Sequence, residues 1–335
     1  MNILITGGVG FIGSNFILYY LEKYPDIKIV NLDKLTYAAD TSNLESIKSN
    51  KRYTFIEGDI CDRFLLQKLF SQYKFNGVIH FAAESHVDNS IKSPTSFIST
   101  NILGTFNLID IAKNYWMVSP NIFKDGFSNS RFHHISTDEV YGTLGQQGVF
   151  TEQTSYAPNS PYSASKASSD FIVRSYFHTY GMPVVTTNCS NNYGPRQHDE
   201  KLIPTIIRKA LFGEQIPIYG NGKNIRDWLY VEDHCKGIDL VFRDGVCGET
   251  YNIGGKNERT NLYIANTICS ILDEVLPKSN SYKDQIAFVK DRPGHDFRYA
   301  IDATKIEKEL GWKAQENFET GIRKTIDWYI KKYKS

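Results

Sequence analysis

Residues 3–13 read ILITGGVGFIG, a short apolar run that leads into a loop with glycines at positions 7, 10 and 13. Glycine permits a tight turn and lets the backbone approach a pyrophosphate at the N-terminus of the next helix. Asp33 ends the following apolar run, IKIVNLD, twenty residues after Gly13, where a carboxylate can accept hydrogen bonds from ribose hydroxyls. A glycine motif alone is weak evidence, but this order of strand, loop, helix, strand and acid predicts a dinucleotide-binding fold.

The acid at position 33 favours NAD over NADP, because a carboxylate there repels a 2′-phosphate. Lys34 weakens that preference. Asp59, in the sequence EGDI, is interpreted either as a contact to the adenine amine or as a turn-forming residue.

Short apolar runs alternate with longer helix-compatible stretches through the first half of the chain. The predicted strands are NILIT, IKIVNLD, YTFIEGD, GVIHFAA, RFHHIST and PVVTTNCS, and the predicted helices cover 11–24, 62–73, 94–116 and 161–181. This alternation predicts an α/β fold with a Rossmann-type doubly wound parallel sheet. We expect residues 1–190 to form the NAD-binding domain.

After Asn191 the pattern loosens into helical stretches near 201–213, 232–243, 261–276 and 317–332, separated by segments rich in Gly, Pro and charge. We expect residues 191–335 to form mainly a smaller, mixed nucleotide-sugar-binding domain, with some strands and helices returning to the first. The segment 114–130 connects predicted elements and matches no function.

Charge and cysteine content exclude several classes of function. Lys plus Arg number 38 against 37 Asp plus Glu, which predicts no nucleic-acid or membrane partner. Five cysteines without a CxxC pair indicate reduced thiols and a cytoplasmic protein. His86, His133 and His134 have no partner at ligand spacing, so we expect no metal.

Two pairs of polar residues indicate chemistry. Asp138 and Glu139 follow Thr137 in STDEVYG, either as a strand end entering solvent or as part of a site. Tyr162 and Lys166 in PYSASK lie at i and i+4, on one face of a helix that starts near Pro161. By spacing alone, a tyrosine and a lysine four residues apart are typical of a pair on the surface of a helix. A base near neutrality requires the tyrosine pKa to fall from about 10, a change that Lys166 and a nicotinamide cation would favour.

The stretches GGVGFIG, HFAAESHVDNS, STDEVYG, YSASK, NNYGP and RDWLYVED together resemble the extended short-chain dehydrogenase/reductase family, and within it the dTDP-glucose 4,6-dehydratases. The resemblance runs from Asn2 to about Trp328. It implies tightly bound NAD, a hexose carried on a nucleoside diphosphate, and a homodimer packed through helices. The product would be a 4-keto-6-deoxy sugar that feeds dTDP-rhamnose or another deoxysugar.

The resemblance also gives the acid pair a role. Oxidation at C4 makes the C5 proton acidic, and the enzyme then needs a base for that proton and an acid for the departing C6 hydroxyl. Glu139 as base and Asp138 as acid fill these roles. Consecutive strand residues point to opposite faces, so both acids reach one substrate only if the chain leaves strand geometry near Asp138.

The resemblance assigns the remaining site residues. Thr137, Asp138, Glu139, Tyr162 and Lys166 are the expected catalytic residues. NAD is expected to contact Gly7, Gly10, Phe11, Ile12, Gly13, Asp33, Lys34, Leu35, Thr36, Asp59, Ile60, Phe81, Ala82, Ala83, Ser85, Thr100, Tyr162, Lys166 and Asn192. The nucleotide sugar is expected to contact Ser85, Thr137, Asn191, Lys201, Leu202, Pro217, Ile218, Tyr219, Arg226, Asn261, Arg292 and His295. From the residues alone, each arginine is equally an ion-pair residue, and Tyr219 equally an ordinary strand aromatic.

Four rival interpretations share much of this pattern. A nucleotide-sugar 4-epimerase uses the glycine loop, Tyr162 and Lys166 but has no use for the acid pair. A sugar decarboxylase or a GDP-mannose dehydratase usually carries a non-acidic residue in place of Asp138. If the protein were a non-catalytic NAD-sensing regulator, we would expect the catalytic residues to be replaced. All of them are present. The sequence leaves the nucleotide base open.

Overall fold

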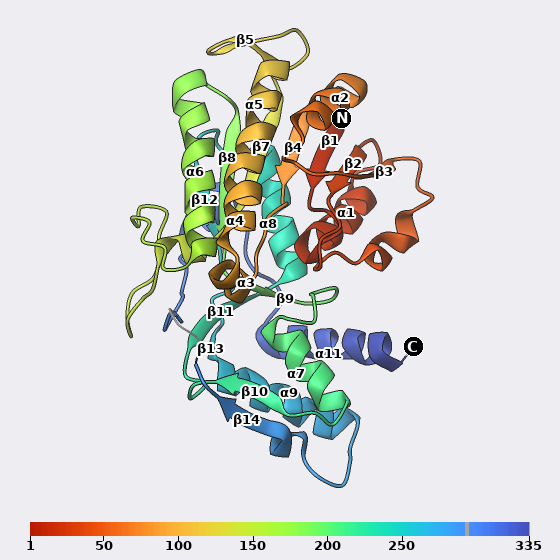
Figure 1. Cartoon of the computed structure of the whole chain (residues 1–335), viewed down its shortest axis with the longest axis vertical. Coiled ribbons are helices and arrows are strands. Elements are labelled where there is room, and N and C mark those ends of the chain that lie inside the picture. The colour runs from red at the N-terminus through yellow and green to blue at the C-terminus, as the bar shows by residue number, and fades with distance from the viewer. Residues whose placement is uncertain (292–294, 335) are drawn as a thin grey trace.

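Seven parallel strands form the central sheet of the protein (Figure 1). The computed structural model describes residues 1–291 and 295–334. The strands are β1 (Asn2–Thr6), β2 (Lys28–Asp33), β3 (Tyr53–Glu57), β4 (Gly77–His80), β7 (Arg131–Thr137), β8 (Val184–Cys189) and β12 (Thr250–Ile253), in the spatial order β12-β8-β7-β4-β1-β2-β3. The chain moves outward from β1 to β3 and then returns to β4 on the other side of β1. Ligands of α/β proteins bind at such a reversal, beyond the carboxyl ends of the strands.

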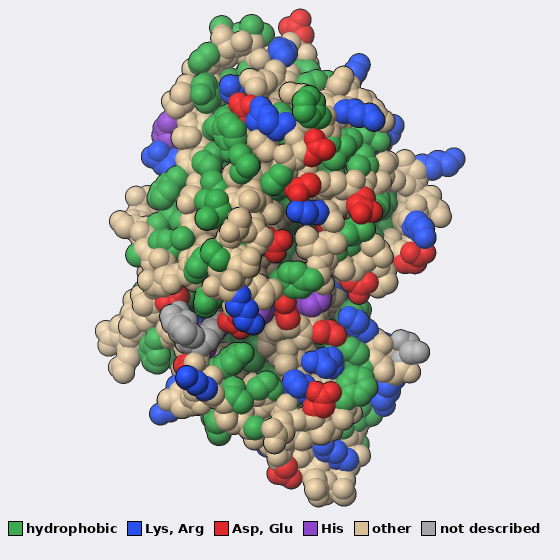
Figure 2. All heavy atoms as spheres, viewed as in Figure 1, with side chains coloured by type: hydrophobic (Ala, Val, Ile, Leu, Met, Phe, Trp, Pro, Cys, Tyr) green, Lys and Arg blue, Asp and Glu red, His purple; other side chains and the backbone are tan. Residues whose placement is uncertain are grey.

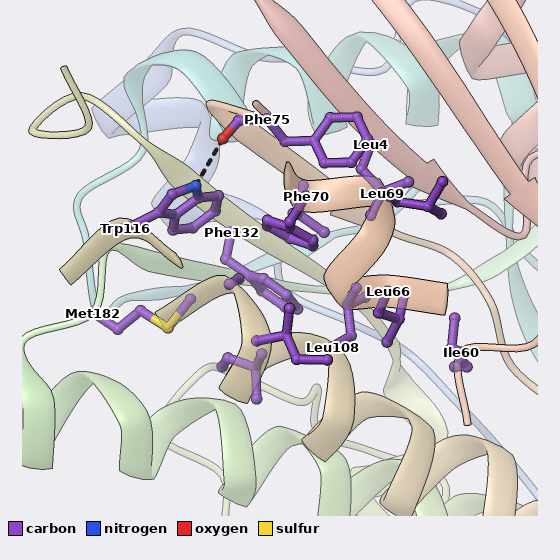
Figure 3. Packing of buried hydrophobic residues seen from close by; sticks show 14 of the residues in the cluster. Leu4, Ile60, Leu66, Leu69, Phe70, Phe75, Leu108, Trp116, Phe132 and Met182 are labelled. Carbon is purple, nitrogen blue, oxygen red and sulfur yellow. Dashed lines mark hydrogen bonds between the residues drawn. The ribbon is translucent and has the colours of Figure 1, made fainter. Parts of the chain in front are cut away.

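Helices cover both faces of this sheet, because alternate strand residues point to opposite sides. Leu4 packs in the cluster formed with α2 (Arg63–Tyr73), α5 (Thr105–Trp116) and α6 (Pro161–Tyr180). Ile3 and Ile5 pack on the other face with α1 (Phe11–Lys23) and α8 (Val231–Asp244). Figure 3 shows the first cluster, in which the indole of Trp116 donates a hydrogen bond of 2.7 Å to the carbonyl oxygen of Phe75. The apolar runs of the sequence are thus the two buried faces of one sheet.

A second region lies beside the carboxyl ends of the sheet, in the lower part of Figure 1. It contains the sheet β13-β11-β9, the parallel pair β10-β14 and three helices. Their bounds are β9 (Asn191–Tyr193), β10 (Ile216–Tyr219), β11 (Ile225–Tyr230), β13 (Glu258–Thr260), β14 (Ile286–Val289), α7 (Leu202–Leu211), α9 (Asn261–Val275) and α11 (Phe318–Lys334). A separate core holds it together, with Ile203, Ile268 and Ile322 among its buried side chains. Two later elements, α8 and β12, belong instead to the first region.

The predicted α/β fold class and parallel sheet are confirmed, and the differences lie in short or irregular elements. The stretch 94–116 is divided into α4 (Pro94–Phe97), the π-helix η2 (Ile98–Gly104) and α5. Four short helices have no counterpart in the prediction: α3 (Val87–Lys92), α10 (Thr304–Leu310), and the 3-10 helices η1 (Thr41–Ile47) and η4 (Tyr282–Gln285). The short strands at Met117–Ser119 and Ile122–Phe123, and β9 to β14, were not predicted either. Such elements carry too few residues to show a hydrophobic period.

Residues 114–130 contain a small hairpin of β5 (Met117–Ser119) and β6 (Ile122–Phe123), which projects at the top of Figure 1. Val118 and Ile122 are exposed there. Across residues 1–291 and 295–334, every helix is too short or too polar to span a membrane.

Candidate active site

A cavity of about 320 Å³ lies along the carboxyl ends of the central strands. It brings together most of the predicted site residues, although they come from separate parts of the chain. Its lining includes Gly7, Gly10, Phe11, Ile12, Gly13, Asp33, Lys34, Thr36, Asp59, Ile60, Phe81, Ala82, Ala83, Ser85, Thr100, Thr137, Asp138, Glu139, Tyr162, Lys166, Asn191, Asn192 and Lys201. Figure 2 shows acidic and histidine side chains near the boundary between the upper and lower regions.

The glycine loop needs glycine for steric reasons. Gly7 has φ of +72°, and a Cβ atom there would lie 2.5 Å from the backbone nitrogen of Ala82. A Cβ atom on Gly13 would lie 2.5 Å from the carbonyl oxygen of Gly7. Helix α1 begins directly after the loop, and its N-cap residue Gly10 provides no side-chain hydrogen bond. The first N–H groups of α1 therefore fit the pyrophosphate of a dinucleotide.

Asp33 ends β2 beside this loop. One carboxylate oxygen accepts a hydrogen bond of 2.9 Å from the N–H of Val9, and the other accepts one of 3.0 Å from the N–H of Leu35. Burial raises the pKa of Asp33, while these backbone hydrogen bonds act in the opposite direction. Each oxygen keeps acceptor capacity for a hydroxyl group. Leu35, which is absent from the cavity lining, thus positions the Asp33 carboxylate through its backbone.

Lys34 points to a neighbour within the same cavity. Its ammonium group lies 2.7 Å from the carboxylate of Asp59, and this contact raises the pKa of Lys34 and helps to lower that of Asp59. The charge that we expect to weaken the preference for NAD is therefore paired with an acid.

Strand β7 ends at Thr137, and the 3-10 helix η3 (Asp138–Tyr141) begins with the two acids. The chain leaves strand geometry at Asp138, which is the condition that allows both acids to line one cavity. Asp138 is only 2% exposed. Its Oδ1 accepts a hydrogen bond of 3.4 Å from Thr137, and its Oδ2 has no partner among the described residues. Burial, followed by the charges of Glu139 and Asp227, raises the pKa of Asp138 well above its ordinary value. The surroundings of Asp138 thus favour the neutral form of its carboxyl group.

Tyr162 and Lys166 enter the cavity from the first turns of α6, where Pro161 and a capping box at Ser160 start the helix. Lys166 is 4% exposed, and its ammonium group donates a hydrogen bond of 2.8 Å to the carbonyl oxygen of Ile135. Burial lowers the pKa of Lys166. Burial and the Glu139 charge raise the pKa of Tyr162 well above its ordinary value, against a hydrogen bond with Thr137. In the protein alone, burial and the Glu139 charge therefore shift the pKa of Tyr162 in the direction opposite to the lowering that a base requires.

Asn191 and Lys201 line the cavity, whereas the other predicted substrate residues of the second region that the structure describes lie outside its lining. Arg226 on β11 is 6% exposed, stacks at 4.2 Å on the ring of Tyr299, and donates a hydrogen bond of 2.9 Å to the carbonyl oxygen of Asp296. Its charge acts against the raised pKa of Asp138, so β11 approaches the acid pair.

The other predicted contacts surround β10 and the start of two helices. Tyr219 is 40% exposed, with its ring 6.4 Å from that of His295, and His295 lies 2.6 Å from Asp291. Ile218 is buried and Pro217 precedes it on β10. Leu202 begins α7 and Asn261 begins α9. Arg292 lies outside the described residues.

Glu200 and Tyr299 are among the residues of this part of the molecule that were not predicted. Glu200 lines the cavity and accepts a hydrogen bond of 3.2 Å from Tyr37. Tyr299 is buried under Arg226, and burial together with the Glu139 charge raises its pKa. Neither residue stands in a motif, and only the tertiary structure brings them to the site.

Comparisons with known proteins identify the family. The family described as GDP-mannose 4,6 dehydratase matches residues 4–325. The dTDP-glucose 4,6-dehydratase of Salmonella typhimurium is 54% identical, over 98% of this chain and 93% of its own length. The chain belongs to the dTDP-glucose 4,6-dehydratases of the extended short-chain dehydrogenase/reductase family.

Solved structures agree with this family. The Bacillus anthracis dTDP-glucose 4,6-dehydratase in complex with NAD has a TM-score of 0.88 and 45% identity, covering 100% of this chain and 98% of that one. DesIV, the dTDP-glucose 4,6-dehydratase of Streptomyces venezuelae, has a TM-score of 0.89 and 42% identity, covering 99% and 97%. A UDP-glucose 4-epimerase from Thermotoga maritima shares the fold at a TM-score of 0.86 but only 26% identity, covering 99% and 100%. Fold alone therefore does not separate dehydratase from epimerase, whereas sequence identity does.

Proposed function

We propose that this protein converts dTDP-glucose to dTDP-4-keto-6-deoxy-glucose and water, with NAD as a cofactor that is regenerated in each turnover. The observation that carries the proposal is the acid pair: Asp138 and Glu139 line the same cavity as Tyr162 and Lys166. The family membership and the relatives crystallised with NAD support it.

Tyr162 removes the proton of the C4 hydroxyl as the C4 hydride departs. When bound, NAD accepts that hydride and later returns it to C6. The hydroxyl of Thr137 binds the same C4 oxygen, since it already bonds to Tyr162. Because burial raises the pKa of Tyr162, ionisation requires positive charge from Lys166 and from the nicotinamide ring.

Water loss uses the acid pair in opposite protonation states. Glu139 removes the C5 proton, which the C4 ketone has made acidic, and Asp138 protonates the departing C6 hydroxyl. Burial raises the pKa of Asp138 well above its ordinary value, which favours the protonated form that an acid needs. A pair of adjacent carboxyls whose environments differ in this way is a recognised acid–base arrangement.

The remaining predicted residues hold the two ligands. Asp33 accepts the ribose hydroxyls and α1 receives the pyrophosphate, which favours NAD. Arg226, with Arg292, Asn191 and Asn261, holds the diphosphate of the sugar nucleotide. Tyr219 packs on the base, and Lys201, Leu202 and His295 complete the nucleotide site. Because Tyr219 is exposed on β10, its face is accessible to a base.

The test is to incubate purified protein with dTDP-glucose, UDP-glucose, GDP-mannose and UDP-glucuronate in separate reactions and to analyse each product by mass. We expect loss of one water from dTDP-glucose, without net consumption of NAD. The Asp138→Asn protein serves as the matched control for water loss. A product of unchanged mass with inverted C4 would identify a 4-epimerase, and loss of carbon dioxide a decarboxylase.

We also propose a cytoplasmic homodimer. Large hydrophobic side chains are exposed on η2, α5 and α6: Ile98, Leu103, Phe106 and Phe171. Figure 2 shows hydrophobic surface over these helices. An exposed apolar patch on neighbouring helices is typical of a protein interface. Light scattering tests the proposal, and a monomeric mass would contradict it.

A further inference from the structure

Helix α6 lies along β7, and three of its side chains meet successive positions of that strand. Tyr162 bonds to Thr137 at the strand end, and Lys166 donates to the carbonyl oxygen of Ile135 at 2.8 Å. One helical turn further, Asp170 accepts a hydrogen bond of 2.8 Å from Ser136. The proposed reaction uses the first two contacts, and nothing in it yet uses the third.

Burial and several hydrogen bonds fix the position of the Asp170 carboxylate. It is 5% exposed, and its Oδ2 also accepts a hydrogen bond of 3.0 Å from the hydroxyl of Tyr156. Its Oδ1 lies 3.0 Å from Nε2 of His134, the residue that precedes Ile135 on β7. The carboxylate therefore joins α6, β7 and the segment before α6.

The charge state of Lys166 depends on the Asp170 carboxylate. Burial lowers the pKa of Lys166, and the charge of Asp170 is the largest influence in the opposite direction. An ammonium ion enclosed by protein loses its proton readily unless a negative charge stands nearby.

We propose that Asp170 is a positioning residue for the oxidation at C4: its charge keeps Lys166 an ammonium ion, and its hydrogen bonds fix the end of β7 against α6. This inference rests on the proposed function, since it assigns Asp170 an effect on the proton transfer at Tyr162. Asp170 itself does not touch the substrate.

Titratable groups from several neighbouring elements surround Asp170 and Lys166. Asp170 faces His134 on β7, Tyr141 on η3 and Tyr156 before α6, and Lys166 faces His80 on β4 and Cys189 on β8. Burial lowers the pKa of both histidines well below the ordinary value and raises the pKa of the tyrosines and of Cys189. These groups are neutral near pH 7, so Asp170 provides the negative charge on Lys166. Burial raises the pKa of Asp170 to about 6, and the Lys166 charge and the hydrogen bonds from Ser136 and Tyr156 act in the opposite direction, so the ionised form still predominates at pH 7.

The experiment compares Asp170→Asn with Asp239→Asn in the full-length protein loaded with NAD. Asp239 is also fully buried, and it accepts hydrogen bonds from Tyr24 at 2.9 Å and from Lys23 at 2.6 Å, away from the cavity. Formation of NADH is followed in a single turnover with dTDP-glucose from pH 5 to pH 9. A residue with only a structural role would change stability without changing the pH profile.

We expect Asp170→Asn to slow NADH formation at pH 7 by at least about tenfold, the effect of roughly one pK unit at Tyr162. The acidic limb of the pH–rate profile of Asp170→Asn should move to higher pH. The reason is that Tyr162 is harder to ionise when Lys166 carries less positive charge. The Asp239→Asn profile should coincide with the wild-type profile. Coincidence of the Asp170→Asn profile with both would overturn the proposal.

Tyr156→Phe provides a second variant if Asp170→Asn fails to fold. It removes one hydrogen bond that lowers the pKa of Asp170, so Asp170 becomes protonated at a higher pH. We expect slower NADH formation near pH 6 and recovery of the wild-type rate by pH 9; equal rates throughout would refute the role of Asp170. If the wild-type protein itself released no water from dTDP-glucose, the proposed function would fail, whereas an unchanged variant beside an active wild type would defeat only this inference.

Discussion

The proposed cofactor side and the proposed nucleotide side of the site are built in different ways. The cofactor side consists of strand ends and backbone turns from the first four strands of the sheet, where Gly7, Gly13 and Asp33 have fixed neighbours. The nucleotide side consists of side chains from β10, β11 and the start of α9, and Tyr219 and Arg226 do not line the main cavity. The residues of a site at one sheet edge can be predicted from a continuous sequence motif. The residues of a site formed by separate loops are harder to predict, because they depend on how two regions of the fold pack together. The acid pair and Tyr162 line the same cavity as the proposed cofactor residues, and the charge of Arg226 acts on Asp138.

Tyr162→Phe should give the largest effect. Removing the phenol oxygen leaves the C4 hydroxyl without a base, and we expect the single-turnover rate of NADH formation to fall by about 10²–10⁴-fold. Tyr176→Phe is the matched control, since this buried tyrosine of the same helix bonds to Asp110 and not to the cavity. A loss below tenfold would mean that another group removes the proton.

Asp138→Asn and Glu139→Gln should fail after the first hydride transfer. In at least one of them we expect NADH to accumulate in rapid-quench or absorbance measurements, with water loss slowed by about 10²–10³-fold because proton transfer is impaired. If neither variant ever reduced NAD, these acids would instead serve substrate binding.

Asp33→Asn should narrow the preference for NAD over NADP by about tenfold, because a neutral side chain no longer repels a 2′-phosphate. Competitive binding of the two dinucleotides to the purified protein provides the measurement. The matched control is Asp26→Asn, which changes an exposed acid just before the other end of β2. Tighter binding of NADP than NAD by the wild-type protein would contradict the role of Asp33.

Asp138 should also make stability depend on pH. Its pKa is raised in the folded protein, so the folded state keeps a proton that the unfolded chain releases above about pH 4. The free energy of unfolding of the wild type should therefore decrease, relative to that of Asp138→Asn, as the pH rises from 4 to 7, by on the order of 1 kcal/mol per unit at most. Denaturant titrations at several pH values measure this difference. A constant difference would show that the Asp138 pKa is not raised.

Much of the fold was predictable because long apolar runs and glycine loops are local features. The predicted stretches 11–24 and 161–181 correspond to α1 and α6, and the break at Asp138 appears as the start of η3. The π-helix η2 was not predictable, because its sequence continues the helical pattern of its neighbours. The short strand β12 joins the sheet through pairing with β8 rather than through a period of its own.

The candidate site shows the same contrast between features that are local in the sequence and features that depend on the tertiary structure. Tyr162 and Lys166 share a helix face, and the glycine loop upstream, rather than the spacing of four alone, predicted a catalytic role for them, whereas their electrostatics were not predictable. The direction of the Tyr162 pKa depends on Glu139 and on burial, and the contact of Lys166 with Ile135 depends on the packing of α6 on β7. Tyr299 reaches the acids only through the fold.

The central claim is that one hydride leaves C4 and returns to C6 of the same sugar, while Glu139 exchanges the C5 proton with solvent. The most direct test is to react dTDP-glucose deuterated at C4 and to locate the label in the product by NMR and mass. The account predicts deuterium at C6 of a 4-keto-6-deoxy sugar, without added NAD being consumed, and in heavy water solvent deuterium at C5. Label recovered at C4 of an intact hexose would contradict the dehydratase function and would leave only the cofactor site and the role of Tyr162 in place.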